Sequence, residues 1–77
     1  MIEKLIEALH EELDDVKKYM LLYAQAHEEI APEILGIAED ELHHARMIVG
    51  MIHKMGGEIS DEDLETVEQA EAMDEED

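Results

Sequence analysis

Apolar residues recur in steps of three and four along residues 2–30, the spacing that places side chains on one face of an α-helix. This first stripe consists of Ile2, Leu5, Leu9, Val16, Tyr19, Tyr23, Ala26 and Ile30. One acidic residue, Glu12, falls near the middle of the stripe, where the pattern requires an apolar side chain. We therefore predict a long helix over residues 2 to about 29, with one carboxylate inside its apolar face.

A second helix is predicted to begin at Pro32 and to end near Met55. Proline suits the first turn of a helix, and the pair Gly56-Gly57 is a typical stop signal. The apolar stripe of this helix consists of Ile34, Ala38, Ala45, Ile48, Ile52 and Met55. Glu41 occupies the one position that interrupts it. Because the connection between the two helices is short, they are expected to form an antiparallel hairpin.

The charge distribution changes after residue 57. Residues 58–77 contain 11 acidic and no basic residues, whereas residues 1–57 contain 12 acidic and five basic ones. This step predicts a helical hairpin over 1–57 and an acidic C-terminal tail over 58–77. Ser60 resembles a helix start, so a short third helix packed through Leu64 and Val67 is the alternative to a disordered tail. Residues 74–77 are expected to be disordered.

The composition narrows the ways in which so small a domain can be stabilised. A chain of 77 residues is too short to bury a large core, and it has no cysteine for disulfides or thiolate metal sites. Metal binding and self-association remain. The formal net charge of −18 attracts cations and disfavours nucleic acid and anionic membranes as partners. No signal peptide or membrane-spanning run is recognisable, so we expect a cytoplasmic protein.

The pair Glu41 and His44 is the strongest candidate for chemistry in this chain. Three residues apart on a helix, the two side chains share one side, whereas His43 points toward the polar face. A buried carboxylate without a partner costs several kcal/mol, and all five basic residues fall on or near polar faces. A bound cation is the simplest compensation. Carboxylates and imidazole suit iron or manganese, and zinc is conceivable.

Glu12, Glu41 and His44 are therefore the candidate metal ligands. Asp15, at the edge of the first stripe, is expected to lie beside the ligands or in solvent rather than to bind metal. One hairpin is half of a four-helix bundle, and pairing two copies about a two-fold axis doubles the ligands. The result is one Glu from each of two helices and a Glu-x-x-His from each of the other two, the ligand pattern of di-iron carboxylate bundles. This predicts a homodimer holding two metal ions.

Two stretches resemble a known family. They are Glu11-Glu12-Leu13-Asp14-Asp15-Val16-Lys17-Lys18-Tyr19 and Pro32-Glu33-Ile34-Leu35, the latter followed by Glu41-Leu42-His43-His44-Ala45. Together they cover roughly residues 11–55, and they resemble ferritin-like and rubrerythrin-like proteins reduced to two helices, above all the encapsulated ferritins.

The resemblance implies an all-α hairpin that dimerises into a ferritin-like four-helix bundle. It also implies that Glu12, Glu41 and His44 bind iron between subunits, with two Fe per dimer, and oxidise Fe²⁺ with O₂ in iron storage or detoxification. Ring-shaped higher oligomers inside the shell of a protein nanocompartment are further implications.

Two other hypotheses remain open. The chain could be a metal-free helical interaction module whose acidic tail binds a basic partner. In that case Glu12 and Glu41 would set the register of a helix interface, as single polar positions in an apolar seam can do. The second alternative is a non-redox metal-binding protein, or a manganese protein, on the same scaffold.

Overall fold

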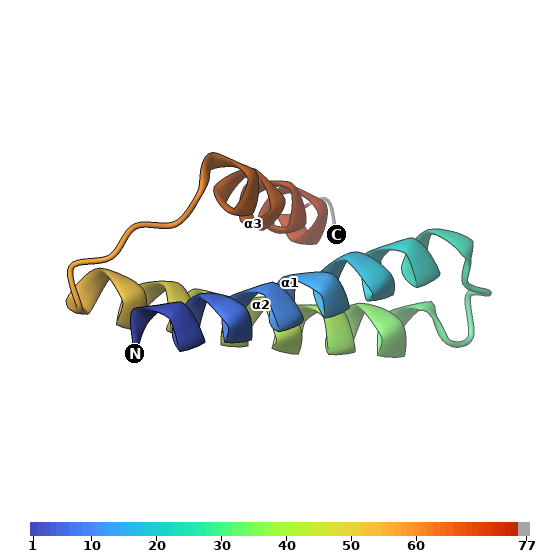
Figure 1. The fold of residues 1–77 in the computed structure, drawn as a ribbon. Coiled ribbons are helices and arrows are strands. Elements are labelled where there is room, and N and C mark those ends of the chain that lie inside the picture. The colour runs from blue at the N-terminus through green and yellow to red at the C-terminus, as the bar shows by residue number, and fades with distance from the viewer. Residues whose placement is uncertain (76–77) are drawn as a thin grey trace.

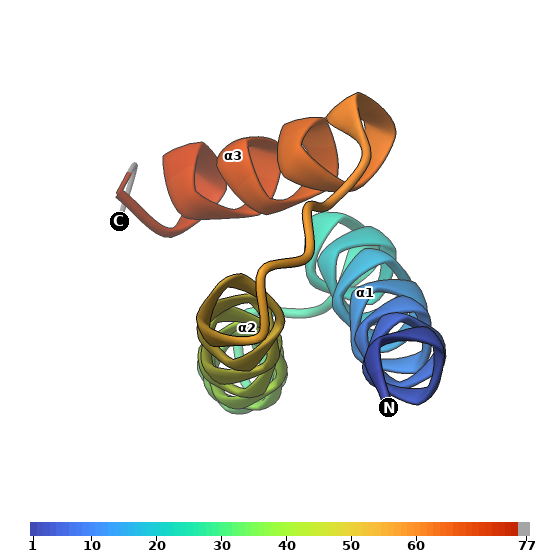
Figure 2. The same ribbon diagram turned by 60° about the vertical axis from the view of Figure 1, so that its left-hand side comes forward.

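The computed structural model describes residues 1–75, which form three α-helices joined by short connections. They are α1 (Ile2–Gln25), α2 (Ala31–Lys54) and α3 (Asp61–Glu75). Helices α1 and α2 run antiparallel and side by side, and α3 lies above them (Figure 1). The view in Figure 2 shows that α3 crosses both, starting over α1 and ending over α2. The all-α hairpin predicted from the sequence is confirmed, and the acidic segment adds a third helix to it.

The connection between α1 and α2 begins earlier than the sequence pattern predicts. The backbone turns extended at Ala26 (φ −77°, ψ 147°), which ends α1 at Gln25. The carbonyl of His27 then accepts hydrogen bonds from the backbone N–H groups of Ile30 (3.0 Å) and Ala31 (2.9 Å). Ile30 therefore belongs to the turn rather than to the stripe of α1, and its side chain is half exposed.

Two glycines end α2, as predicted. Gly56 adopts a left-handed backbone with φ +80°, a conformation that glycine reaches without steric cost. The N–H of Gly57 donates to the carbonyl of Ile52 at 2.9 Å, and that of Gly56 donates to His53 at 3.0 Å. Gly57 also lies so close to Ile52 and Ile2 that a side chain has little room there. The turn thus closes the end of the hairpin against the start of α1.

The buried core lies where all three helices meet. It consists of Leu9, Leu13, Val16, Ala38, Leu42, Ala45, Ile52, Val67 and Ala70. Leu13 and Leu42 were not on the predicted stripes, and they are buried in one cluster with Val67 and Ala70 of α3. The prediction that Leu64 packs with Val67 is wrong for Leu64, which is 44% exposed whereas Val67 is 7% exposed. Helix α3 thus shifts the core to one side of the hairpin.

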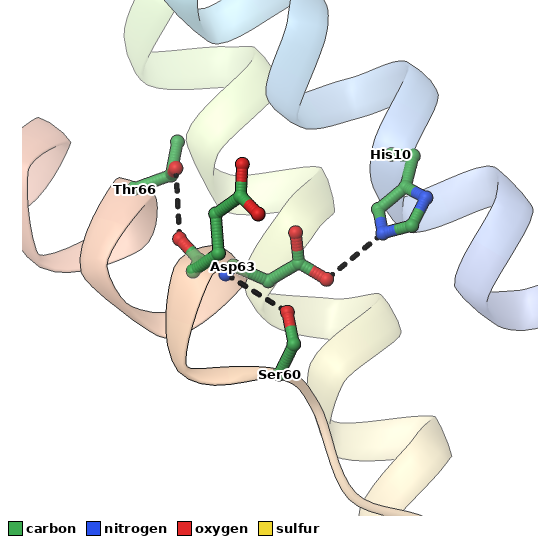
Figure 3. A network of polar contacts seen from close by, with 5 residues as sticks. His10, Ser60, Asp63 and Thr66 are labelled. Carbon is green, nitrogen blue, oxygen red and sulfur yellow. Dashed lines mark hydrogen bonds and ion pairs between the residues drawn. The ribbon is translucent and has the colours of Figure 1, made fainter.

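Polar contacts fasten α3 to both helices of the hairpin. Near its start, Asp63 Oδ2 lies 2.9 Å from His10 Nε2 of α1 (Figure 3). Toward its end, Glu71 Oε2 lies 2.9 Å from Arg46 Nη2 of α2. The hydroxyl of Ser60 accepts a hydrogen bond from the Asp63 backbone N–H at 3.1 Å and so caps the first turn (Figure 3). The Ser60 start signal is therefore confirmed.

Two further expectations concern the C-terminal residues and membrane-spanning segments. Of the four C-terminal residues expected to be disordered, residues 74 and 75 belong to α3, and residues 76–77 lie outside the described residues. None of the three helices described is both long and apolar enough to cross a membrane.

Candidate metal centre

The three predicted ligands come from both helices of the hairpin. Glu12 is carried by α1, and Glu41 and His44 are carried by α2. Glu12 directly precedes Leu13, and Glu41 directly precedes Leu42. Both leucines belong to the part of the core that α3 covers. Because consecutive residues are about 100° apart around a helix, the glutamates point to the neighbouring side of the hairpin. Partial exposure of both agrees with a position on the side that α3 leaves open.

The structure brings these three side chains together. One ligand atom from each of Glu12, Glu41 and His44 lies within 4.8 Å of the others. The distance from His44 Nδ1 is 3.6 Å to Glu12 Oε2 and 4.0 Å to Glu41 Oε1. These separations are too long for hydrogen bonds. Because metal–ligand bonds of about 2 Å place ligand atoms roughly 3–4 Å apart, small side-chain rotations would let one cation touch all three.

The cluster is open on one side. The side chains of Glu12 and Glu41 are 26% and 21% exposed, whereas that of His44 is 53% exposed. His44 therefore lies at the rim of the cluster, with about half of its side chain exposed to solvent. The two carboxylates form the floor of the site and the imidazole forms its outer edge.

The electrostatics of the cluster fit a cation. The pKa of Glu41 is raised above its usual value, first by the hydrogen bond that its protonated form makes with Glu12, then by burial and by the charges of Glu12 and Asp15. The Oε2 atom of Glu12 is buried and receives no hydrogen bond. A buried acceptor without a donor is unfavourable. A metal ion would satisfy this oxygen and remove the repulsion that raises the pKa of Glu41.

Two residues near the cluster are His43, which points away from it, and Asp15, which affects the pKa of Glu41. The ring of His43 lies 6.2 Å from that of His44, between centroids, but His43 is not part of the cluster. The sequence placed it on the polar face, and the structure agrees. Asp15 borders Glu41 closely enough to raise its pKa. Its spacing of three residues from Glu12 is the sequence signal for this proximity.

Comparison with known proteins agrees with this geometry. A family model described as rubrerythrin matches residues 3–76, a range that includes the three candidate ligands and all of the three helices except Ile2. Neither the search of curated proteins nor the search of solved structures gave a match. The extent of the family match and the helical hairpin show that the chain belongs to the rubrerythrin family of ferritin-like proteins.

Proposed function

We propose that two copies of this chain bind two iron ions between them and oxidise Fe²⁺ to Fe³⁺ with O₂. The observation that carries the proposal is the buried, unbonded Oε2 atom of Glu12, which lies in one cluster with Glu41 and His44. Membership of the rubrerythrin family supports iron as the metal. The metal would be held by Glu12, Glu41 and His44 of both copies.

A second copy is proposed because one hairpin supplies too few ligands. Two carboxylates and one imidazole leave iron with open positions, whereas doubling the set gives the four Glu and two His of di-iron bundles. Half-buried and exposed apolar residues continue the stripe on both sides of Glu41 and His44. They are Ile37, Ile48, Met51 and Met55. Burying this stripe against its counterpart would cover the exposed side of His44 and stabilise a dimer.

The residues of the site favour the oxidised product. Fe²⁺ is the substrate: two Fe²⁺ ions each give one electron to O₂, which takes up two protons from the solvent and becomes hydrogen peroxide. The carboxylates of Glu12 and Glu41 attract Fe³⁺ more strongly than Fe²⁺ because the Coulomb energy grows with the charge of the ion. His44, at the rim, completes the ligands without adding negative charge. The exposed side of the cluster admits iron from solvent.

We further propose, from the resemblance to encapsulated ferritins, that the dimers assemble into rings inside a protein shell. A hairpin of this size encloses no storage cavity, so stored iron would have to collect outside the chain. Sedimentation of the purified protein tests the rings, and co-purification with a shell protein tests the compartment.

The central test is an anaerobic titration with Fe²⁺, followed by thermal melting and by sedimentation equilibrium. Ligand binding to the folded state raises the melting temperature. We expect Fe²⁺ to raise it in the wild type and in the control His43→Ala, and not in Glu41→Gln. Admitting O₂ to the loaded wild type should then produce O₂ uptake in proportion to the iron added.

Two results would favour the alternatives. Identical melting of the wild type and Glu41→Gln with and without Fe²⁺ would support the metal-free interaction module. Stabilisation by Fe²⁺ or Mn²⁺ without O₂ uptake would support a non-redox metal-binding protein.

A further inference from the structure

We propose that two copies of this chain pair antiparallel on the open side of the hairpin, about a two-fold axis that crosses α2 between Leu42 and His43. The inference rests on the proposed function and deepens it, because it fixes how the second copy lies. Ile37 of one copy then packs opposite Ile48 of the other.

The stripe that the structure leaves open on α2 has a symmetric spacing. Ala38, Ala45 and Ile52 are buried against the rest of the chain. The stripe beside them is half-buried or exposed, and its members follow one another in alternating steps of four and three, the spacing of a coiled-coil seam. They are Ile30, Ile34, Ile37, Glu41, His44, Ile48, Met51 and Met55. The order of the steps is the same from either end.

The centre of this symmetry lies between Glu41 and His44. Ile37 lies as many residues before the centre as Ile48 lies after it. The same relation holds for the two outer apolar pairs, which are Ile34 with Met51 and Ile30 with Met55. Antiparallel pairing about this point places an apolar residue opposite an apolar residue in every outer layer, and Glu41 level with His44 of the second copy. A two-fold dimer requires such a self-complementary surface.

The centre of symmetry is also the middle of the hairpin. Helices α1 and α2 contain 24 residues each, so their midpoints come directly after Leu13 and directly after Leu42. The contact of 3.6 Å between Glu12 Oε2 and His44 Nδ1 therefore crosses the hairpin beside both midpoints. Because the axis passes through the middle, each hairpin covers the open side of the other along its full length.

Helix α1 carries a matching stripe on the side of Glu12. Its members follow one another in steps of three and four and are half-buried or exposed: Leu5, Ala8, Glu12, Asp15, Tyr19 and Leu22. This stripe is symmetric about the midpoint of α1. Leu5 therefore lies level with Leu22 of the second copy, and Ala8 lies level with Tyr19. Both helices of the hairpin support the same axis.

Charges beside the open stripe of α2 favour antiparallel over parallel pairing. Glu33 directly precedes Ile34, and Lys54 directly precedes Met55, so the two charged residues flank the stripe on the same edge, and both are exposed. Antiparallel pairing brings Glu33 of each copy beside Lys54 of the other. Residues 26–33, which join the helices, contain three acidic residues and neither lysine nor arginine. Parallel pairing would bring these acidic segments of both copies to the same end, where they repel each other.

Cross-linking of introduced cysteines tests the register, because the chain has no cysteine of its own. Ile37→Cys and Ile48→Cys are prepared separately, refolded together, loaded with Fe²⁺ under anaerobic conditions and treated with a short bismaleimide. A denaturing gel should show cross-linked dimers in the mixture. Each variant alone should give about tenfold less, since a residue and its own copy would lie about 16 Å apart along the helices.

A second pair of positions guards against a local disturbance by the first. Ile30→Cys with Met55→Cys probes the outermost layer, where both side chains are about half exposed and a substitution disturbs the fold little. The mixture should again cross-link and the separate variants should not. Equal cross-linking of the mixture and of the separate variants at both layers would show that the register is wrong.

Exchange of the flanking charges tests the orientation. Glu33→Lys should raise the dimer dissociation constant about fivefold relative to Glu68→Lys, which changes the charge equally at an exposed position of α3. Adding Lys54→Glu to Glu33→Lys restores opposite charges at unchanged net charge, and the constant should return to within about twofold of the wild type. Sedimentation equilibrium measures all four proteins. A double variant no tighter than Glu33→Lys alone would exclude this pairing.

The outcomes distinguish this inference from the proposed function. If the wild type dimerises and binds Fe²⁺, but Ile37→Cys cross-links to its own copy as readily as to Ile48→Cys, the antiparallel register is wrong and the shared metal site remains. If the wild type stays monomeric with and without Fe²⁺, the shared site itself is refuted, and the register falls with it.

Discussion

The carboxyl groups of Glu12 and Glu41 meet across the hairpin, and the protonated form of Glu41 forms a hydrogen bond with Glu12 that raises the pKa of Glu41. The two residues come from antiparallel helices, α1 and α2. The imidazole of His44 lies 3.6 Å and 4.0 Å from their oxygens, too far for hydrogen bonds. Without a metal ion, this arrangement places two like charges together in a partly buried position.

Replacing Glu12 by Gln should stabilise the metal-free protein and abolish its response to metal. The amide removes one charge and can donate a hydrogen bond to Glu41. The free energy of unfolding should rise by about 1 kcal/mol, the usual size of one such contact. Urea unfolding followed by circular dichroism in the presence of a chelator measures this change. Glu11→Gln, at the exposed neighbouring residue, is the control. Lower stability of Glu12→Gln than of Glu11→Gln would contradict the expectation.

The metal-free protein should lose stability as pH rises, through Glu41. A carboxyl whose pKa is raised by folding binds its proton more tightly in the folded state. Its stabilising contribution is complete below the usual pKa of 4.5 and is lost as pH rises through the higher folded pKa. Glu41→Gln cannot titrate at this position. The stability of the wild type relative to Glu41→Gln should therefore fall over this pH range.

Measuring the two proteins side by side removes the background of the other acidic residues, which they share. Unfolding in chelated buffers at several pH values gives the difference. Glu68→Gln, an exposed substitution on α3, should follow the wild type. A constant difference between the wild type and Glu41→Gln across the range would show that Glu41 has an ordinary pKa.

Packing rather than ion pairing should hold α3 on the hairpin. Val67→Ala removes buried methyl groups and should cost roughly 1–2 kcal/mol of stability. Arg46→Ala breaks the contact with Glu71, but both side chains are about half exposed, so the cost should stay below about 1 kcal/mol. Chemical denaturation compares the two variants, with Leu64→Ala as the exposed control. A larger loss for Arg46→Ala than for Val67→Ala would contradict this ranking.

Two glycine substitutions should have opposite effects. At Gly57, an added Cβ would lie 2.9 Å from Ile52 Cγ2 and 3.2 Å from Ile2 Cγ2, so Gly57→Ala forces these side chains to move. We expect a loss of about 1–2 kcal/mol from this overpacking. Gly36 lies inside α2 with nothing within 4 Å of the added Cβ, and Gly36→Ala should stabilise the helix by up to about 1 kcal/mol. Melting temperatures of both variants test the pair, and equal shifts would refute it.

Local signals in the sequence predicted the hairpin well. Pro32 and the pair Gly56-Gly57 lie close to the ends of α2 in the structure. The end of α1 was harder to predict, because Ala26 continues the apolar stripe and alanine is not a residue type that stops a helix. The interruption of both stripes by Glu12 and Glu41 located two of the three members of the cluster. Whether the cluster binds iron is decided by the titrations proposed above.

The sequence alone determined where α1 begins, the approximate bounds of α2, the antiparallel pairing of the two helices and the presence of acids in their apolar faces, because these follow from periodicity and from the residues that start and stop helices. Only the tertiary structure decided how each apolar face is divided. Helix α3 takes one part of it, which buries Leu13 and Leu42 and leaves His44 on the open side. The polar composition of α3 did not predict that it would cover part of the hairpin, since Val67 and Ala70 are small apolar residues among many acids. Which side of a helix is covered depends on where the next element docks, and periodicity within one helix carries no information about that.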